Sequence, residues 1–433
     1  MATATKIFSL EGKGLKLDSA ADVEPHIKTL REMKDVEEVR FLGNTLGVEA
    51  CRVIGEVLEE KTSLKNEGTN IVADLYIKIA NLADIFTGRL LNEIPQALSS
   101  LLTALLKLPN LHTVNLNDNA FGLNTQAPLV AFLSSHTPLQ HLILNNNGLG
   151  PHAGILIADA LSALHAKKVE ARAAGKQVPD LETVICGRNR LENGSMTAWA
   201  KAYSLHTGVK EVKMVQNGIR QEGISHLLSE GLKYAKDIEI LDLQDNTFTI
   251  TGSKALARVV GGWANIQELG VGDSLLGGKG SVIFAEALKK GRNNKLEILR
   301  LQFNDIGVKG LTVFTAAAKE ALPKLKKIEL NGNKFDEDHD CIVELKELLE
   351  ERKEKLAGEI IIEDDWGLDE LEDLEGESDE ESDEEEEEEE ELEEQREKLI
   401  HDAEEAQEGE PVAQREDKDV DGLAKVLGKN LQV

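Results

Sequence analysis

The sequence predicts an α/β solenoid in which short parallel strands form an inner sheet and helices cover its outer side. Three observations lead to this fold class: ten copies of one apolar pattern between residues 36 and 333, a polar residue that ends each copy, and steps of mostly 27 to 31 residues. The clearest copy, from Leu139 to Gly148, fits L-x-x-L-x-L-x-x-N. This pattern is the signature of the leucine-rich repeat, and the step length leaves room for one strand and one helix per unit.

Each part of the repeat has a physical reason. The leucines at the first, fourth and sixth places point inward from a short strand, and the asparagine satisfies backbone groups where the chain leaves that strand. An apolar helix face then covers the strand, as Leu156, Ile157 and Leu161 suit after Asn147. One unit cannot bury its own apolar side, so the units must stack into a horseshoe like that of ribonuclease inhibitor. The asparagines and their stand-ins are Asn44, Asp84, Asn119, Asn147, Asn189, Asn217, Asn246, Asp273, Asn304 and Asn333.

Three intervals between these residues are longer than one repeat. Asn44 to Asp84 covers 40 residues, Asp84 to Asn119 covers 35, and Asn147 to Asn189 covers 42. The third interval holds a polar stretch, 166–180, that we expect to extend the outer helix or its loop. The second holds the segment 86–95, directly after a strand end. Inserts in a solenoid gather on one face, and that face often binds a partner.

Charge and composition divide the chain into three parts. We expect a leucine-rich repeat domain with an N-terminal cap at 1–357, an acidic disordered segment at 358–394, and a helix-compatible tail at 395–433. Residues 359–394 hold 24 Asp and Glu and no Lys or Arg, out of a net charge of −30. The like charges of such a block repel one another, and the block buries no apolar surface. It is therefore either a solubilising tail or a segment that attracts a basic partner surface. It disfavours nucleic-acid binding, because phosphate would be repelled.

Other site classes find little support. The sequence holds no run of 18 apolar residues, so no membrane span is predicted. Its three cysteines lie far apart and indicate a reducing compartment without disulfides. The histidines do not cluster at metal-ligand spacings, so no metal site is predicted. The stretch Gly272–Ser281 resembles a phosphate-binding loop, but an extra glycine precedes Lys279 and Gly280 replaces the hydroxyl residue after it. We therefore expect no nucleotide or other cofactor of the chain's own.

The position just before each asparagine is a separate signal. It lies at the strand end, outside the buried leucine pattern, and its first five occupants are polar or charged. This row is Asp118, Asn146, Arg188, Gln216, Asp245, Gly272, Phe303 and Gly332. With Arg89 on its loop, the row could grip a polar partner surface. Ordinary solvated strand ends explain the pattern equally well.

Five blocks are specific beyond the repeat pattern. They are Phe86-Thr-Gly-Arg89 with Glu93-Ile-Pro95, Leu144 to Gly150, Cys186 to Met196, Met214 to Arg220, and Leu241 to Phe248. On these blocks the chain resembles the Ran GTPase-activating proteins, which join a leucine-rich repeat domain to an acidic tail. The resemblance covers about residues 1 to 390 and includes the insert at 166–180. With no large domain predicted after the acidic stretch, the chain is most similar to the shorter fungal-like members.

The resemblance implies that the chain acts by stimulating the reaction of a partner enzyme. Such a protein accelerates hydrolysis of the GTP held, with Mg²⁺, by the Ran GTPase. The family is regarded as orienting the GTPase's own catalytic glutamine through an exposed asparagine, which motif matching places at Asn146. Arg89 matches an essential arginine that would order the loop and interface, although its type also suits an arginine finger. Leu91 stands where the family often has a basic residue.

The resemblance also implies a binding surface and a setting. GTPase contacts are expected from Glu93, Asp118, Arg188, Arg190, Gln216 and Asp245. The implied partners are Ran in its GTP form together with Ran-binding protein, with no nucleic acid or membrane involved. We expect a monomer in the cytoplasm, including the perinuclear region, where GTP hydrolysis would set the direction of nuclear transport. The alternative is a non-catalytic repeat scaffold that binds another protein through the same concave face.

Overall fold

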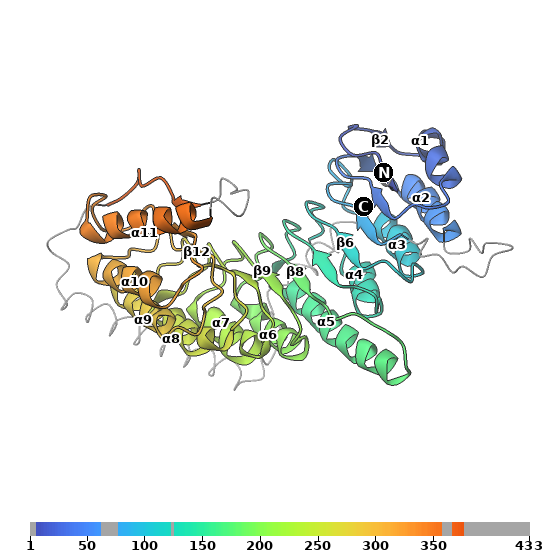
Figure 1. Ribbon diagram of the computed structural model, residues 1–433. Coiled ribbons are helices and arrows are strands. Elements are labelled where there is room, and N and C mark those ends of the chain that lie inside the picture. The colour runs from blue at the N-terminus through green and yellow to red at the C-terminus, as the bar shows by residue number, and fades with distance from the viewer. Residues whose placement is uncertain (1–5, 62–76, 123–124, 357–365, 376–433) are drawn as a thin grey trace, which may run out of the picture. The chain divides into compact units, whose positions relative to one another are not determined.

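The computed structural model describes residues 6–61, 77–122, 125–356 and 366–375 (Figure 1). These residues belong to one compact unit, Met1–Glu377. Of the acidic segment predicted at 358–394, residues 358–365 and 376–394 lie outside the described residues. The tail at 395–433 and part of the first long interval, at 62–76, lie outside them too. In the described part, no helix is long and apolar enough to cross a membrane.

A single twelve-stranded sheet forms the inner layer of this unit, and every strand pair in it is parallel. Its strands follow chain order as β1 (Ile7–Ser9), β3 (Glu38–Arg40), β5 (Ile79–Asn81), β6 (Thr113–Asn115), β7 (His141–Ile143), β8 (Thr183–Ile185), β9 (Glu211–Lys213), β10 (Ile240–Asp242), β11 (Glu268–Gly270), β12 (Ile298–Arg300), β13 (Lys327–Glu329) and β14 (Gly367–Leu368). Corresponding repeat positions pair, as Leu142 does with Val184. The predicted solenoid of parallel strands is confirmed.

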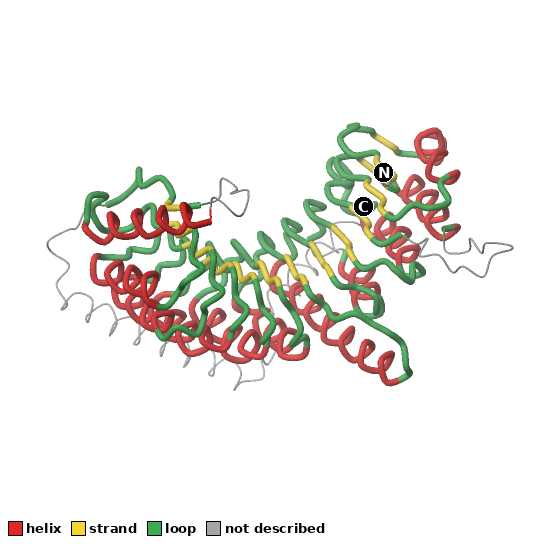
Figure 2. The backbone as a smooth tube through the Cα atoms, viewed as in Figure 1, coloured by secondary structure: helices red, strands yellow, loops and turns green. Residues whose placement is uncertain are grey.

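Helices cover one side of the sheet, and Figure 2 shows most of them in a row below the strands in that view. They are α1 (Ala20–Glu32), α2 (Val48–Glu60), α3 (Ile94–Leu105), α4 (Gln126–Leu133), α5 (Gly150–Ala173), α6 (Met196–Leu205), α7 (Gln221–His226), α8 (Thr249–Val259), α9 (Gly277–Lys289), α10 (Val308–Glu320) and α11 (Asp340–Leu356). Short helical turns η1 (Asn193–Ser195), η2 (Leu227–Gly231), η3 (Leu232–Tyr234) and η4 (Val260–Gly262) complete this layer. The middle residue of most strands, such as Leu142, Val184 and Leu241, is fully buried against the helices.

Insert 166–180 extends the outer layer as expected, because α5 runs on to Ala173 before the chain loops back. Lys168 fastens this loop. Its ammonium is buried and donates to the carbonyl oxygens of Thr137, Leu139 and Pro179 at 2.7–2.8 Å. Burial lowers the pKa of Lys168 to about 8. The lysine therefore holds the insert against the preceding turn.

The asparagines form a ladder of buried side chains that joins each repeat to its neighbours. Asn147 is typical: its Nδ2 donates to the carbonyls of Leu116, Leu144 and Asn145, and its Oδ1 accepts from the backbone of Asn119. Each side chain thus satisfies backbone groups of two repeats, at positions where unpaired groups would be costly.

The sequence assigned two aspartates to the asparagine position of their repeats, and both assignments are wrong by one residue. Asp84 and Asp273 occupy the position before the asparagine, whereas Ile85 and Ser274 occupy the asparagine position itself. Ile85 and Ser274 supply the backbone N–H that bonds to the asparagine of the next repeat. The prediction missed this because neither residue resembles asparagine, while the adjacent aspartates do.

The repeat domain ends in a C-terminal cap that reaches past residue 357. Residues 366–375 add β14 to the sheet, although the sequence places them in the acidic segment 358–394. The carboxylate of Asp369 accepts from the backbones of Leu330 and Asn331, and the indole of Trp366 donates to the carbonyl of Leu349. These bonds cover the polar edge that the last strand would otherwise expose.

Candidate protein-binding site on the strand-end loops

A row of residues in left-handed backbone conformation follows the strands, one residue before each asparagine position. Its φ angles lie between 47° and 73°. The row is Gly43, Asp84, Asp118, Asn146, Arg188, Gln216, Asp245, Asp273, Phe303 and Gly332. Non-glycine residues rarely adopt this conformation, and a bulky one such as Phe303 does so only when its surroundings impose it. Gly272, which the sequence places in this row, precedes it: the row residue of that repeat is Asp273.

Hydrogen bonds between repeats impose this conformation. The backbone N–H of Asn146 donates to the carbonyl of Gly187 in the following repeat at 3.0 Å, and that of Arg188 donates to Val215 at 2.8 Å. Gln216 and Asp245 bond in the same way to the next loop, each at 3.0 Å. The turn is therefore repeated along the edge of the sheet, and each row side chain leaves the backbone from the same turn.

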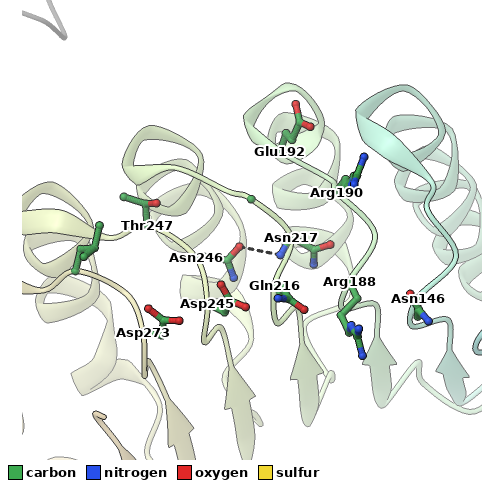
Figure 3. Close-up of a pocket in the computed structure, with 12 residues that line it drawn as sticks. Asn146, Arg188, Arg190, Glu192, Gln216, Asn217, Asp245, Asn246, Thr247 and Asp273 are labelled. Carbon is green, nitrogen blue, oxygen red and sulfur yellow. Dashed lines mark hydrogen bonds between the residues drawn. The ribbon is translucent and has the colours of Figure 1, made fainter. Parts of the chain in front are cut away.

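Four of the predicted contact residues line one open hollow together with Asn146. They are Arg188, Arg190, Gln216 and Asp245. Asn146, Arg188, Gln216, Asp245 and Asp273 follow the ends of the successive strands β7 to β11 (Figure 3). The hollow has a volume of about 730 Å³. Its lining is completed by Arg190, Glu192, Asn217, Gly218, Asn246, Thr247 and Leu275. Its breadth and polarity suit a protein surface better than a small molecule.

The orientation of the Asn146 amide is set by Asp118. Asn146 is exposed, and its Nδ2 donates to the Asp118 carboxylate at 2.9 Å. A carboxylate only accepts hydrogen bonds at neutral pH, so it must face the amide nitrogen rather than the amide oxygen. Asn146 Oδ1 therefore remains available as an acceptor for a partner.

The far end of the hollow is acidic. Partial burial raises the pKa of Asp245, and the neighbouring Asp273 carboxylate adds to that shift, while a hydrogen bond from the Gln216 side chain opposes it. Two carboxylates side by side repel each other, and a cation brought by a partner would relieve this repulsion. Arg188 and Arg190 bring the opposite charge to the same hollow.

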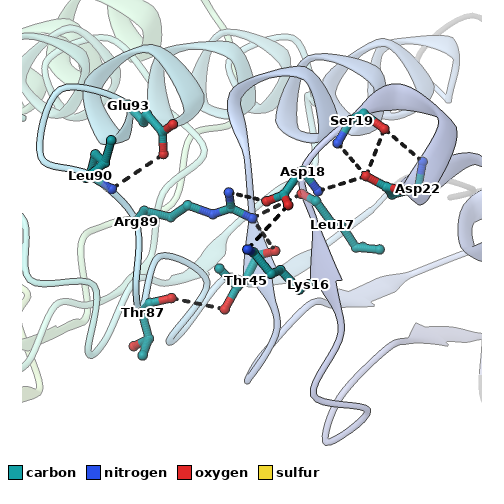
Figure 4. Close-up of polar contacts among 10 residues, drawn as sticks. All are labelled: Lys16, Leu17, Asp18, Ser19, Asp22, Thr45, Thr87, Arg89, Leu90 and Glu93. Atoms are coloured by element: carbon teal, nitrogen blue, oxygen red, sulfur yellow. Dashed lines mark hydrogen bonds and ion pairs between the residues drawn. The ribbon is translucent and has the colours of Figure 1, made fainter.

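Arg89 is turned inward to the N-terminal cap. Its side chain is only 8% exposed and forms an ion pair with Asp18. The guanidinium also donates to the carbonyls of Leu17, in β2 (Lys16–Leu17), and Thr45, in β4 (Thr45–Leu46) (Figure 4). The Arg89 hydrogen bond and charge lower the pKa of Asp18. In this position Arg89 braces the loop and offers no free guanidinium to a nucleotide.

The loop that Arg89 braces carries an exposed apolar tip. Leu90 and Leu91 are 65% and 62% exposed, although leucine usually avoids water. Glu93, at the start of α3, accepts a hydrogen bond from the Leu90 backbone at 3.4 Å. Glu93 and Arg89 do not line the hollow around Asn146, and their loop forms a second, separate part of the strand-end surface.

Comparison with known proteins identifies the family to which the chain belongs. The chain is 40% identical over 341 residues to Ran GTPase-activating protein 1 of Saccharomyces cerevisiae, covering 78% of the chain and 80% of that protein. The chain belongs to the Ran GTPase-activating protein family. It is also 41% identical over 215 residues to Ran GTPase-activating protein 1 of Xenopus laevis, and 34% identical over 334 residues to Ran GTPase-activating protein of Drosophila melanogaster. A leucine-rich repeat family model matches residues 292–314.

The match covers the relatives unequally. The chain spans four fifths of the yeast protein, but the aligned parts cover 34% of the Xenopus and 53% of the Drosophila protein. Membership in the Ran GTPase-activating protein family therefore rests on the match to the yeast protein, which covers 78% of the chain.

Sequence reasoning missed part of the strand-end surface. Glu192, Thr247, Asp273 and Leu275 line the hollow but were not expected there. Counting from each strand end, rather than from each apparent asparagine, would have found Asp273. The glycine-rich stretch at 272–281 begins α9, where Gly280 packs so closely on Ser253 that a Cβ would lie 2.7 Å from its Oγ. No group of three potential metal ligands occurs in the part of the chain that the structure describes.

Proposed function

We propose that this chain accelerates GTP hydrolysis by the Ran GTPase and is itself an activator, with GTP and Mg²⁺ held by the partner. Two observations support the proposal. The chain belongs to the Ran GTPase-activating protein family, and its strand-end surface presents the polar groups that such assistance needs. The observation that carries the mechanism is Asn146, whose amide is exposed and oriented by Asp118.

Asn146 acts on the partner's glutamine. GTP hydrolysis needs a positioned water, and an unassisted GTPase orients it poorly because its glutamine is mobile. Asn146 Oδ1 accepts a hydrogen bond from the glutamine NH₂ group, which leaves the glutamine carbonyl free to accept one from the attacking water. Asp118 is a positioning residue, because it decides which end of the Asn146 amide faces the partner.

Arg89 acts as a brace in this mechanism. Its guanidinium is occupied by Asp18 and by two backbone carbonyls, so it orders the loop 86–95 before the GTPase arrives. A finger role would require these contacts to break and a nearly buried side chain to swing out. Preorganisation by contacts already in place costs less on binding.

The remaining strand-end residues hold the GTPase. Asp118, Arg188, Arg190, Gln216 and Asp245 would contact its surface around the hollow. Glu93 would contact it from the Arg89 loop. Two arginines stand between acidic residues on either side, and such a charge pattern favours one orientation of the partner over others.

Family membership supports a proposal about where and with which partners the chain works. We propose that the chain works as a monomer in the cytoplasm, including the perinuclear region, on Ran in its GTP form together with Ran-binding protein. Hydrolysis restricted to that compartment would release export complexes there and set the direction of nuclear transport.

Phosphate release from Ran-bound GTP tests this function. Purified chain at a substoichiometric ratio is expected to convert an excess of Ran·GTP, because an activator turns over. A scaffold that only binds Ran would change at most one GTP per protein. No acceleration, with Ran shown to be loaded with GTP and the chain shown to be folded, would reject the activator role.

A further inference from the structure

A second hollow, on the helix side of the repeats, carries mostly positive charge. It is lined by residues of α8, η4 and α9 and by the ends of the neighbouring loops, and its volume is about 820 Å³. Six cationic side chains line it, against one carboxylate, that of Glu286. The cations are Lys233, Lys236, Lys254, Arg258, Lys290 and Arg292. Three consecutive repeats thus gather cations at one place in a chain of net charge −30.

Two of these cations converge on η4, one from the repeat before it and one from the repeat after it. A Cβ at Gly261 would lie 3.0 Å from Cδ of Arg292, and one at Gly262 would lie 3.4 Å from Nζ of Lys236. Both cationic side chains therefore occupy space that larger residues in η4 would fill. The pair of glycines lets cations from different repeats approach the same short turn.

Buried hydrogen bonds hold the backbone that carries these two cations. Nδ2 of Asn293 donates to the carbonyls of Val260 and Trp263 at 2.8 and 3.1 Å, which ties the loop after α9 to η4. The Trp263 indole donates to the carbonyl of Leu232 at 3.0 Å, which ties η4 to η3. The side chains of Asn293 and Trp263 are fully buried. The floor of the hollow is therefore fixed by contacts within the repeats.

Helix dipoles explain only part of the positive charge. Arg258, in the last turn of α8, and Lys290, directly after α9, complement the dipoles of their helices. Lys236 and Arg292 lie past the helix ends, are exposed, and form no ion pair with another residue of the described ranges. Like charges held over one turn repel each other, so an anion from a partner would relieve that repulsion.

The hollow also has an apolar part. Val282 and Ile283, on α9, are partly exposed and lie outside the buried core of the repeats. The aliphatic side chains that line the hollow beside the cations are Ala257, Val259, Val282, Ile283 and Ala287. No aromatic side chain is among the described residues of this lining, so the hollow has no platform on which nucleic-acid bases could stack.

We propose that this basic hollow binds a short acidic segment of another protein, in which carboxylates alternate with apolar side chains. The carboxylates pair with Lys236 and with the guanidinium of Arg292, whose planar fork of donors matches a carboxylate. The apolar side chains of the segment cover Val282 and Ile283. A hollow of about 820 Å³ is too large for a single small anion and falls within the range of about 300–1,000 Å³ that encloses larger ligands.

Charge on the rest of the chain favours a short partner segment over an extended polyanion. A nucleic acid or an anionic membrane would reach well beyond the hollow and would meet the field of a chain whose net charge is −30. A short peptide places its carboxylates among the six cations and extends little past them.

Fluorescence anisotropy of a labelled peptide tests the proposal, and it needs no GTPase. The probe alternates glutamate with leucine, and a matched probe carries glutamine in place of every glutamate. With the full chain at low salt, we expect saturable one-to-one binding of the acidic probe and no binding of the neutral one. Lys236→Glu/Arg292→Glu should weaken binding of the acidic probe by about tenfold or more, because two attractions become repulsions.

Matched variants separate the charged part of the hollow from its apolar part. Lys176→Glu/Lys201→Glu reverses two exposed charges elsewhere and should leave the affinity unchanged. Ile283→Gln keeps all six cations and should remove the preference for this probe over a polyglutamate of equal charge. If the reversed pair fails to fold, the neutral pair Lys236→Gln/Arg292→Gln takes its place and should still weaken binding severalfold.

A loss of affinity in the variants of Lys236 and Arg292, with the matched control unchanged, would support the site. Three outcomes would overturn the proposal. They are no saturable binding of the acidic probe, equal affinities of the wild type and those variants, and tighter binding of an RNA oligonucleotide or an anionic vesicle that is lost in the same variants.

Discussion

Asn146 and Asn147 are neighbours in sequence with opposite environments, and this contrast governs the site at the residue scale. Asn147 is fully buried, and its side chain forms hydrogen bonds with backbone groups of two repeats. Asn146, with φ of 54°, is exposed, and only Asp118 holds its amide. A left-handed turn therefore separates a structural asparagine from one that is free to act on a partner.

Asn146→Ala should abolish most stimulation and leave the fold intact. Loss of one oriented group of this kind typically costs about 100- to 1000-fold in rate. We expect single-turnover hydrolysis on Ran to fall by that factor, with little change in Ran binding. Asn147→Ala should instead lower the free energy of unfolding by about 1–3 kcal/mol, because buried backbone groups lose their partner. Full activity of a folded Asn146→Ala would refute the proposed role.

Arg89→Ala should also reduce activation strongly, but through the loop. The substitution leaves Asp18 and the carbonyls of Leu17 and Thr45 without their partner, so hydrogen exchange in β2 and β4 should increase. Arg89→Lys should rescue only in part, because lysine lacks the planar fork of donors. An aluminium fluoride complex with Ran separates the mechanisms: we expect the guanidinium away from the fluoride, and finding it inserted would establish a finger.

At the scale of elements, stacking depends on side chains that bridge consecutive repeats near the helix ends. His136, after α4, and His206, after α6, are both buried, and each donates from Nε2 to a backbone carbonyl, Leu111 at 2.7 Å and Leu161 at 2.8 Å. Burial lowers the pKa of each imidazole to about 4. Both are therefore neutral bridges in the folded chain.

These histidines predict a loss of stability in mild acid. Between pH 6.5 and 4 these imidazoles bind protons in the unfolded chain but stay neutral in the folded chain. The free energy of unfolding therefore falls as pH decreases through that window. The loss at pH 5, relative to pH 7.5, is about 2 kcal/mol per histidine. Urea denaturation of the wild type and of His136→Gln/His206→Gln at both pH values measures it. Equal pH dependence in the two proteins would contradict the assignment.

The C-terminal cap predicts different outcomes for two truncations. Ending the chain after Glu377 should leave the repeats intact. Ending it after Leu356 removes β14, Trp366 and Asp369, so the edge of β13 and the backbones of Leu330 and Asn331 lose their partners. Hydrogen exchange at 327–333 should rise only in the shorter protein. Equal protection in both would show that the cap contributes nothing.

On the scale of the whole molecule, charge is distributed very unevenly. The acidic stretch 359–394 carries 24 of the 79 Asp and Glu and no cation. Fifteen of these carboxylates lie between residues 377 and 394, so this short segment holds a large negative excess. Such an excess acts at a distance on a basic partner, and its range depends on salt.

Truncation after Glu377 should therefore slow association with Ran, whose surface the family resemblance predicts to be basic. The association rate should fall more than the dissociation rate rises, because steering acts before contact. The difference should fade between 0.1 and 1 M salt, as the Debye length shortens from about 10 Å to about 3 Å. Stopped-flow measurements on both proteins test this. Equal association rates at low salt would leave the segment a solubilising tail.

The sequence by itself determined the repeat fold, the positions of nearly all strands, and Asn146 as an exposed residue beside a buried one. These follow from local chemistry, because a solenoid repeats one short pattern and each unit contacts only its neighbours. Tertiary structure alone decided where Arg89 points, that Asp118 orients Asn146, and that residues 366–375 close the sheet. It also gathered six cations, spread over residues 233–292, into one hollow. Those features depend on contacts between residues 28 to 72 positions apart in the chain, which no pattern within one repeat contains.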